Sequence, residues 1–307
     1  MIPRALKPSV QRILDRLAVY GSRRYIAGDS FADAARLTHS RTDHISRFII
    51  CPWNKPTDKA DAVYQSYTGA LAGILTSSID CYLAVKLPAI DYDTARLREL
   101  LERAAAKDIR IHLDAMTADS VDRTIGIVAQ LRARFSNIGY TVPSRWRRSV
   151  PDLAKLLDLR IPLRIVKGQL PDRNGGEVDP REGFGRIIDL LGNTPCTIGV
   201  ASHDRAIVHA VTLRLQERAI SHEIEQLYGL SVIPATTASK IPRRLYIPYG
   251  HGYPPYDIYT ALRRPGLALR LSRDVMLGYV KTHPLGTTRS VLPRAQKLCR
   301  SEGNFNE

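Results

Sequence analysis

Short apolar runs rich in β-branched residues alternate along the chain with stretches in which apolar positions have helical spacing. Apolar runs of roughly four to eight residues bounded by turn residues are typical of buried strands. The pattern predicts strands at Arg47–Cys51, Cys81–Leu87, Ile109–Leu113, Asn137–Val142, Pro162–Val166, Cys196–Val200, Ile220–Ile224 and Arg244–Pro248. It predicts helices at Tyr92–Ala106, Asp119–Phe135 and Asp204–Arg218, the last two with Asp as the N-cap residue.

A new strand begins about every 24 to 35 residues, which is the size of a strand–helix unit. Eight such units in succession predict an α/β fold, a single-domain (β/α)8 barrel of the TIM type. The alternative is an open doubly wound sheet, against which no GxGxxG sequence follows any predicted strand. We expect an N-terminal helical segment at residues 1–40, the barrel at 41–280 and a basic C-terminal tail at 281–307.

The composition of the 307-residue chain, 44% hydrophobic and 24% charged, excludes a disordered or fibrous protein. The formal net charge is +15, and the excess lies mainly near the two ends. From residue 241 to residue 300 there are eleven Lys and Arg residues but only two Asp. Such basic ends favour a solvated rim or contact with an acidic membrane surface. Nucleic-acid binding is the weaker alternative, because the tail after Lys281 has Phe305 as its only aromatic residue.

The four cysteines lie far apart and form no CxxC pair. This spacing predicts free thiols in a reducing compartment rather than disulfides or a zinc site. No apolar run approaches the roughly 18 residues of a membrane span. We therefore expect a cytoplasmic protein, with peripheral membrane association through its basic ends as an option.

Polar groups recur at the carboxyl ends of six of the eight predicted strands. In a barrel of parallel strands these ends share the face that carries catalytic loops. Charged side chains in or directly after a buried strand are costly unless they are paired or functional. The residues in question are Lys86, Asp114, Arg164 with Lys167, Ser202 with His203 and Asp204, Glu225, and Tyr246.

The fifth predicted strand ends in the sequence RIVKG, in which Arg164 and Lys167 precede Gly168. Two cations next to a glycine suit an anionic or electron-rich ligand, because glycine lets the backbone approach closely. The alternative is a structural ion pair of Arg164 with Asp114 or Glu225.

The sequence Ser202-His203-Asp204 lies between the sixth predicted strand and the helix that follows it. Its side chains and the free N–H groups of the first helical turn suit a phosphate or carboxylate. A plain N-cap is the alternative.

Tyrosines are concentrated between residues 246 and 259, which hold five of the fourteen in the chain. Beyond the eighth strand, Tyr256, Tyr259 and Arg263 have the spacing of one helix face. Aromatic rings with hydroxyl groups form suitable walls for a flat ligand. A well-packed aromatic corner explains the same pattern without a ligand.

Seven short sequences, taken in order, resemble the proline dehydrogenase family. They are Tyr25–Asp29 (YIAGD), Val85–Leu87 (VKL), His112–Ala115 (HLDA), Arg164–Gly168 (RIVKG), Ala201–Asp204 (ASHD), Glu223–Gly229 (EIEQLYG) and Tyr246–Gly250 (YIPYG). They extend over most of the chain, from about residue 24 to about residue 265. The resemblance implies an FAD-dependent (β/α)8 barrel that oxidises proline to a cyclic imine and passes the electrons to quinone.

The resemblance also implies a role for individual residues. Asp114 and Ala115 would lie beside the isoalloxazine, and Arg164 would reach its reactive nitrogen. The rest of the cofactor site would consist of Val166, Lys167, Gly168, Ser202, His203, Asp204 and Glu225. Catalysis would involve Lys86, Asp114 and Tyr246, and the substrate would be bordered by Lys86, Leu227, Tyr246, Tyr256, Tyr259, Arg263 and Arg264.

The chain departs from the family where the substrate would be held. Family members carry YxxRRxxER, whose Arg-Arg pair clamps the proline carboxylate, but Tyr259 and Thr260 stand at these positions and Arg263 replaces the Glu. The family's Leu-Gly-Glu after the first strand is missing, with Asn54 near the place of the carboxylate. Two cofactor glutamines are also replaced, by Pro143 and Glu225.

These features together predict a flavin-dependent oxidoreductase. It would transfer a hydride to FAD from the carbon next to an amine or imino nitrogen of its substrate. The substrate would differ from free L-proline, or proline would be bound differently. The electrons would pass to quinone or another acceptor. The alternative is a relative that has lost catalysis and acts as a binding or scaffold protein. A metal-dependent hydrolase is a weaker alternative, because His112 lies in no His-x-His pair and the ligand set is short. We expect no metal.

Overall fold

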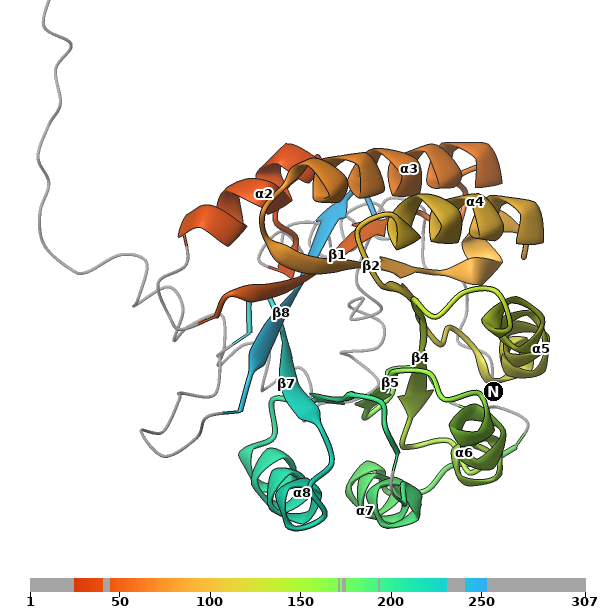
Figure 1. Cartoon of the computed structure of the whole chain (residues 1–307), viewed down its shortest axis with the longest axis vertical. Helices are drawn as coiled ribbons and strands as arrows, with labels where there is room; N and C mark the ends of the chain where they lie inside the picture. Colours follow the sequence, from red (N-terminus) through yellow and green to blue (C-terminus); the bar gives the residue numbers. More distant parts are fainter. Residues whose placement is uncertain are drawn as a thin grey trace, which may run out of the picture. The chain divides into compact units, whose positions relative to one another are not determined.

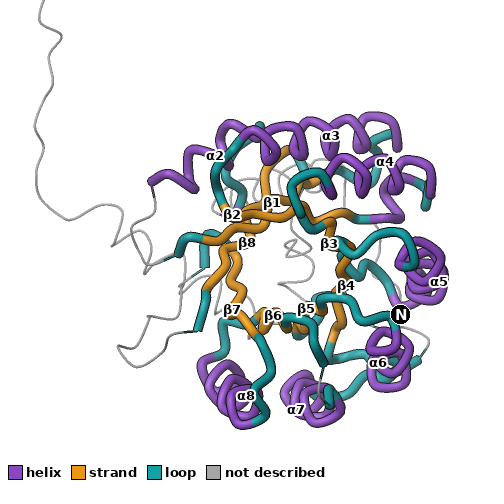
Figure 2. The backbone as a smooth tube through the Cα atoms, viewed as in Figure 1, coloured by secondary structure: helices purple, strands orange, loops and turns teal. Residues whose placement is uncertain are grey.

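The structure is a computed structural model that describes residues 25–40, 45–170, 172, 175–192, 194–230 and 241–252. Residues 1–24 of the predicted N-terminal helical segment and the whole predicted basic tail lie outside these residues, whereas Phe31–Ser40 of that segment is helical. Figure 1 shows a ring of strands with helices on its outside, and Figure 2 shows the same ring as a backbone tube.

Eight parallel strands form a closed barrel in chain order, with β8 pairing with β1. The strands are β1 (Arg47–Trp53), β2 (Asp80–Val85), β3 (Ile111–Leu113), β4 (Ile138–Pro143), β5 (Leu163–Val166), β6 (Ile198–Ala201), β7 (His222–Leu227) and β8 (Arg243–Gly250). Each overlaps one predicted strand, so the (β/α)8 barrel is confirmed and the open sheet is excluded. Every carboxyl end therefore lies on one face.

In the described part of the chain, α-helices follow six of the strands, β1 to β6, and pack outside the barrel (Figure 1). The described helices are α2 (Phe31–Ser40), α3 (Ala60–Thr76), α4 (Thr94–Ala105), α5 (Val121–Arg132), α6 (Ser149–Asp158), α7 (Pro180–Leu190) and α8 (Arg205–Glu217), with 3-10 turns η2 (Leu87–Ile90) and η3 (Ala118–Ser120). α2 precedes β1, and η2 and η3 each precede the helix of their unit. None of the described helices is long and apolar enough to cross a membrane.

The helix starts confirm one predicted N-cap and correct the other. The Asp204 side chain accepts from the N–H groups of Ala206 and Ile207, as predicted. Asp119 does not cap α5, because a 3-10 turn precedes the helix and Thr117 and Ser120 form its capping box. The Thr117 and Ser120 hydroxyls accept from each other's backbone N–H groups at the start of this turn, and Ser120 stands at the N-cap position of α5.

Two layers of buried side chains hold the barrel together. Between strands and helices the core is apolar, as shown by Ile50 and Leu83 of the strands and Leu71 of α3, which are at most 1% exposed. Inside the barrel an apolar group around Ile49 and Tyr82 shares the space with ionisable residues. The ionisable residues that are at most 5% exposed include His112, Arg164, Glu223, Glu225 and Arg244. Because buried charges require partners, the interior depends on ion pairs.

An ion-pair network fills the amino-terminal end of the barrel. Arg244 of β8 donates to Glu223 of β7 at 2.7 Å and to Asp80 of β2 at 2.9 Å. Arg47 of β1 lies 3.1 Å from Asp80 and 3.4 Å from Glu223. Two cations and two carboxylates thus balance at the end opposite the carboxyl ends of the strands.

Small residues on the inner face make room for the large polar ones. A Cβ atom added to Gly139 would lie 2.5 Å from Nδ1 of His112, and one added to Gly199 would overlap the Glu225 carboxylate. The positions of these two glycines therefore fix where His112 and Glu225 fit inside the barrel. Of the cysteines, Cys51, Cys81 and Cys196 are free thiols, as expected.

We predict that Gly199→Ala lowers the free energy of unfolding by about 1–3 kcal/mol, because the new methyl group overpacks the carboxylate of Glu225. Gly126→Ala in α5 is the matched control, since a Cβ there meets nothing within 4 Å. A helical Gly→Ala change is expected to add about 0.5–1 kcal/mol. Urea unfolding measures both, and equal effects of the two substitutions would contradict this packing account.

Candidate active site

Asp114 joins two other side chains at the carboxyl face of the barrel. Its Oδ1 is ion-paired with Nη2 of Arg164, and its Oδ2 accepts from the Tyr246 hydroxyl at 2.9 Å. Thr141 donates to Oδ1 at 3.5 Å. The Arg164 and Asp114 side chains are only 5% and 12% exposed. Strands β3, β5 and β8 thus bring together three residues that the sequence analysis singled out, and the ion pair named there as the alternative is present.

Glu225 of β7 is a second carboxylate beside Arg164. Its Oε2 lies 3.8 Å from Nε of Arg164, and its Oε1 accepts from the Tyr82 hydroxyl at 2.8 Å. Burial raises the pKa of Glu225 to about 7, with Arg164 opposing this rise and Glu223 adding to it. This carboxyl group is therefore poised to change its protonation state near neutral pH.

Arg164 stays charged in these surroundings. Burial alone would lower the pKa of Arg164, but its acidic and phenolic neighbours, Asp114 first among them, raise it well above its ordinary value. Its guanidinium carbon lies 5.1 Å from the centre of the Tyr246 ring, a cation–π distance. Burial, followed by the charge of Asp114, raises the pKa of Tyr246 well above its usual range, so its hydroxyl remains a donor.

Lys86 lies directly after β2 on the same face. Its Nζ is 3.1 Å from Sγ of Cys51, 3.3 Å from the carbonyl oxygen of Pro52 and 5.8 Å from the centre of a Trp53 ring. Within the described ranges no carboxylate forms an ion pair with Lys86. The ammonium group is therefore a cation held by a thiol, a carbonyl and an aromatic face at the mouth of the barrel.

A second group of charges lies at the ends of β5 and β6. Asp204 Oδ2 is 3.0 Å from Nζ of Lys167 and 2.9 Å from Nη2 of Arg181. Burial opposes ionisation, but hydrogen bonds from these two cations lower the pKa of Asp204 to about 2. The N-cap named as the alternative is present, and the three side chains together keep one net positive charge.

Ser202 and His203 support the same loop. The Ser202 hydroxyl accepts from the backbone N–H of Asp204 at 3.1 Å. His203 Nε2 accepts from the backbone N–H of Leu227 at 2.8 Å, which ties the end of β6 to the end of β7. These contacts orient the loop.

The remaining predicted cofactor positions lie close by. Val166 ends β5, and Ala115 is half-buried directly after Asp114. Gly168 has a φ of +83°, and a Cβ there would lie 2.9 Å from Cβ of Pro143, so the turn after β5 requires glycine. Tyr256, Tyr259, Arg263 and Arg264 lie outside the described residues and stay predictions.

Sequence reasoning missed Tyr82, Thr141 and Arg181. Tyr82 lies four residues before Lys86, and His112 lies two residues before Asp114. Side chains two residues apart point to the same face of a strand. This alternation indicates that Tyr82 points inward, whereas no local pattern identifies Arg181.

His112 is an interior residue rather than a metal ligand. Its Nε2 lies 3.2 Å from Oγ1 of Thr141, and burial followed by the charge of Arg164 lowers its pKa well below the ordinary value. In the part of the chain that the structure describes, no group of three or more His, Cys, Asp or Glu residues is placed to hold a metal.

The residues present fit FAD on two observations. First, Nε and Nη1 of Arg164 are buried and have no hydrogen-bond partner among the described residues, so they offer donors to an electron-rich ring. Second, Lys167 and Arg181 place two cations where β5 and β6 end, which suits a pyrophosphate. Arg164 would thus face the ring, and Lys167 and Arg181 the phosphates.

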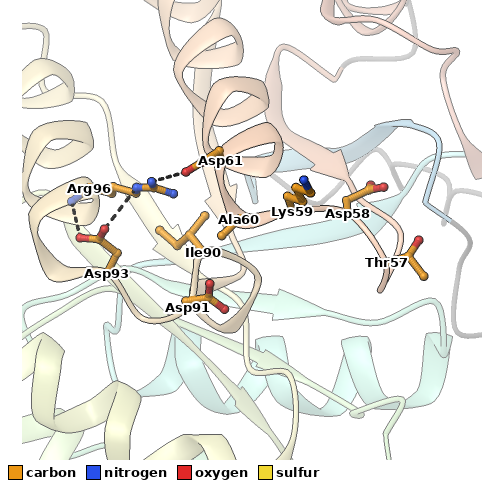
Figure 3. Close-up of a pocket in the computed structure, with 9 residues that line it drawn as sticks. All are labelled: Thr57, Asp58, Lys59, Ala60, Asp61, Ile90, Asp91, Asp93 and Arg96. Atoms are coloured by element: carbon orange, nitrogen blue, oxygen red, sulfur yellow. Dashed lines mark hydrogen bonds and ion pairs between the residues drawn. The ribbon is translucent and has the colours of Figure 1, made fainter.

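A separate pocket of about 500 Å³ lies between the segments that follow β1 and β2 (Figure 3). In it Arg96 lies between Asp61 and Asp93 and is ion-paired with both. Asp58 and Asp91 add two further carboxylates to the lining. None of the residues singled out from the sequence lines this pocket, so it is distinct from the Arg164 cluster.

Comparison with known sequences finds relatives over most of the chain, whereas no family model matches it. The chain is 24% identical over 282 residues to proline dehydrogenase 1 of Bacillus subtilis subsp. natto, covering 83% of this chain and 91% of that protein. It is 25% identical over 284 residues to a proline dehydrogenase of Deinococcus radiodurans, covering 82% of this chain and 89% of that protein.

Solved structures of proline utilization A share the fold. One, from Bdellovibrio bacteriovorus and inactivated by N-propargylglycine, has a TM-score of 0.64 and 16% identity over 76% of this chain. A mutant from Bradyrhizobium japonicum has a TM-score of 0.60 over 88% of this chain. This chain spans 31% and 34% of the length of those two chains, about a third.

We predict that Asp204→Ala costs more stability than Asp179→Ala at neutral pH. Both residues cap a helix through two backbone N–H groups, worth about 1 kcal/mol, but Asp204 also pairs with Lys167 and Arg181. Because its pKa is lowered on folding, this extra stability is present above the unfolded pKa of about 4 and is lost as the pH falls towards 2.

Chemical denaturation of both variants and the wild type at a series of pH values measures the effect. The difference between the variants is expected to shrink below about pH 4. Equal losses with the same pH dependence would show that Asp204 is an N-cap and nothing more.

Proposed function

The chain is a divergent relative of the proline dehydrogenases, and from this premise we propose that it is a flavin-dependent oxidoreductase acting on a CH–NH group. The observation that carries the proposal is the buried Arg164–Asp114–Tyr246 cluster at the carboxyl face, with two guanidinium donors free among the described residues. A permanent cation beside the isoalloxazine would stabilise the negative charge that the ring gains when it accepts a hydride.

FAD, when bound, would accept a hydride from the carbon next to the substrate nitrogen. The chain's own residues would orient the partners and exclude water. Asp114 holds Arg164 and Tyr246 in place through its two oxygens, so that the guanidinium N–H groups that Asp114 does not use would be fixed donors. The substrate would leave as an imine, with the proton on its nitrogen released to solvent.

The substrate is proposed to differ from free L-proline or to be held differently. The family's Arg-Arg pair would supply two charge-assisted hydrogen bonds of about 1.5–3 kcal/mol each. Without it, proline loses roughly two to four decades of binding in the ground or transition state. Lys86 provides one cation at the mouth, and Arg263 and Arg264, four residues further along the sequence than the positions of that pair, are proposed to hold a longer or displaced acid. Quinone or another acceptor would reoxidise the cofactor.

The test is an absorbance spectrum of the purified protein with added FAD, recorded anaerobically before and after a panel of cyclic and linear amines and imino acids. We expect uptake of FAD and bleaching of its visible bands by at least one compound. A protein that takes up no FAD contradicts the proposal. Stable FAD binding with no bleaching by any amine supports instead a relative that has lost catalysis, the alternative favoured by the missing Arg-Arg pair.

We predict that Tyr246→Phe lowers the rate of bleaching by the best substrate about 10- to 100-fold, because Asp114 loses the donor that fixes its second oxygen. Tyr140→Phe is the matched control. Tyr140, on β4, is buried and packs in the apolar core outside the cluster. Stopped-flow reduction measures both variants, and a similar effect of the two substitutions would contradict the role given to Tyr246.

A further inference from the structure

One guanidinium faces two carboxylates inside this barrel. Arg164 uses Nη2 for Asp114, whereas the acid that Nε faces among the described residues is Glu225, at 3.8 Å, too far for a hydrogen bond. Asp114 has further donors in Tyr246 and Thr141, but Glu225 has Tyr82 alone, on Oε1. Among the described residues, Oε2 of Glu225 has no hydrogen-bond partner. Glu225 is therefore the less satisfied of the two acids.

The groups around Glu225 leave its charge incompletely balanced. Tyr82 of β2 and Arg164 of β5 face it in its own layer, and Gly199 of β6 adds no charge. From the layer below, Glu223 of β7 repels it and Arg244 of β8 attracts it, but these two are already paired with each other at 2.7 Å. Two carboxylates thus share one cation, which leaves one net negative charge when both are ionised.

We propose that Glu225 is a positioning residue for Arg164 and takes up a proton from solvent when negative charge is placed at the free Nε and Nη1 edge of that guanidinium. An anionic group there would add a third negative charge around a single buried cation. Protonating Oε2 of Glu225 forms an O–H bond, removes one of these charges and releases Arg164 to the ligand. The proposal rests on the proposed function for the identity of that ligand.

Two observations favour Glu225 over Asp114 as the proton acceptor. The Tyr246 and Thr141 donors stabilise the ionised form of Asp114. The pKa of Glu225 is already raised by burial to about 7, so a small added negative charge near neutral pH suffices to protonate it. His112, which stacks on Tyr82 at 5.4 Å between ring centres, stays neutral because burial keeps its pKa low, and it does not compete for the proton.

The first experiment tests the protonation of Glu225 without cofactor. It measures the thermal stability of the apo protein between pH 5 and 8. A carboxyl group whose pKa is higher in the folded state than in the unfolded chain, about 4.3, makes stability fall as the pH rises through that window. We expect this fall in the wild type and in Glu182→Gln, a control at an exposed surface ion pair, and its loss in Glu225→Gln.

Tyr82→Phe keeps Glu225 and removes the hydrogen bond that favours its ionised form. We expect the fall in stability of this variant to extend to higher pH than in the wild type. This conservative variant still tests the proposal if Glu225→Gln fails to fold. An identical pH dependence in Glu225→Gln and the wild type, or in Tyr82→Phe and the wild type, would overturn the proposal.

The link to ligand charge is tested with bound FAD, by following its midpoint potential from pH 6 to 8. In the wild type and Glu182→Gln we expect the slope of potential against pH to change within this range. Glu225→Gln is expected to show a constant slope. If FAD binds and the wild type and Glu225→Gln show the same change of slope, this inference is overturned. If FAD does not bind, the proposed function is overturned, and the measurement on the apo protein decides whether Glu225 takes up the proton.

Discussion

The burial of a single arginine inside the barrel is the constraint on which the site depends. A guanidinium that is 5% exposed cannot be left without acids, and an isolated buried charge costs several kcal/mol. Asp114 and Glu225 supply those acids from strands on either side of β5, two strands away in each direction. Tyr246 and Tyr82 then complete the hydrogen bonds of the acids. The cluster holds a cation at the catalytic face and keeps part of its donor set free.

The rest of the interior makes this arrangement possible. Gly139 and Gly199 leave the space that His112 and Glu225 occupy, so the small residues on β4 and β6 are as necessary as the charged ones. The network of Arg47, Arg244, Glu223 and Asp80 balances charge at the opposite end. An active-site barrel commonly fills its interior with branched apolar side chains. Here polar layers replace part of that filling, which places titratable groups directly beneath the mouth.

Much of the fold follows from sequence pattern alone. Each predicted strand overlaps an observed one, because buried parallel strands produce short continuous apolar runs. The pairing of Arg164 with Asp114 or Glu225 was also foreseeable, since parallel strands bring their carboxyl ends to one face. Local pattern does not show which of two acids holds the cation, because this depends on side-chain reach across the barrel. The cap of α5 was mispredicted because Asp119 lies within a 3-10 turn, so that Ser120 stands at the N-cap position. Arg181 was missed because it meets Asp204 only through the packing of α7 beside α8.

The central claim is that the free edge of Arg164 faces the ring of a bound flavin. A crystal structure of the protein with FAD tests it most directly. The account predicts an isoalloxazine within hydrogen-bond distance of Arg164 Nε or Nη1, with the pyrophosphate near Lys167 and Arg181. A flavin bound elsewhere, with Arg164 still enclosed between Asp114 and Glu225, would contradict it.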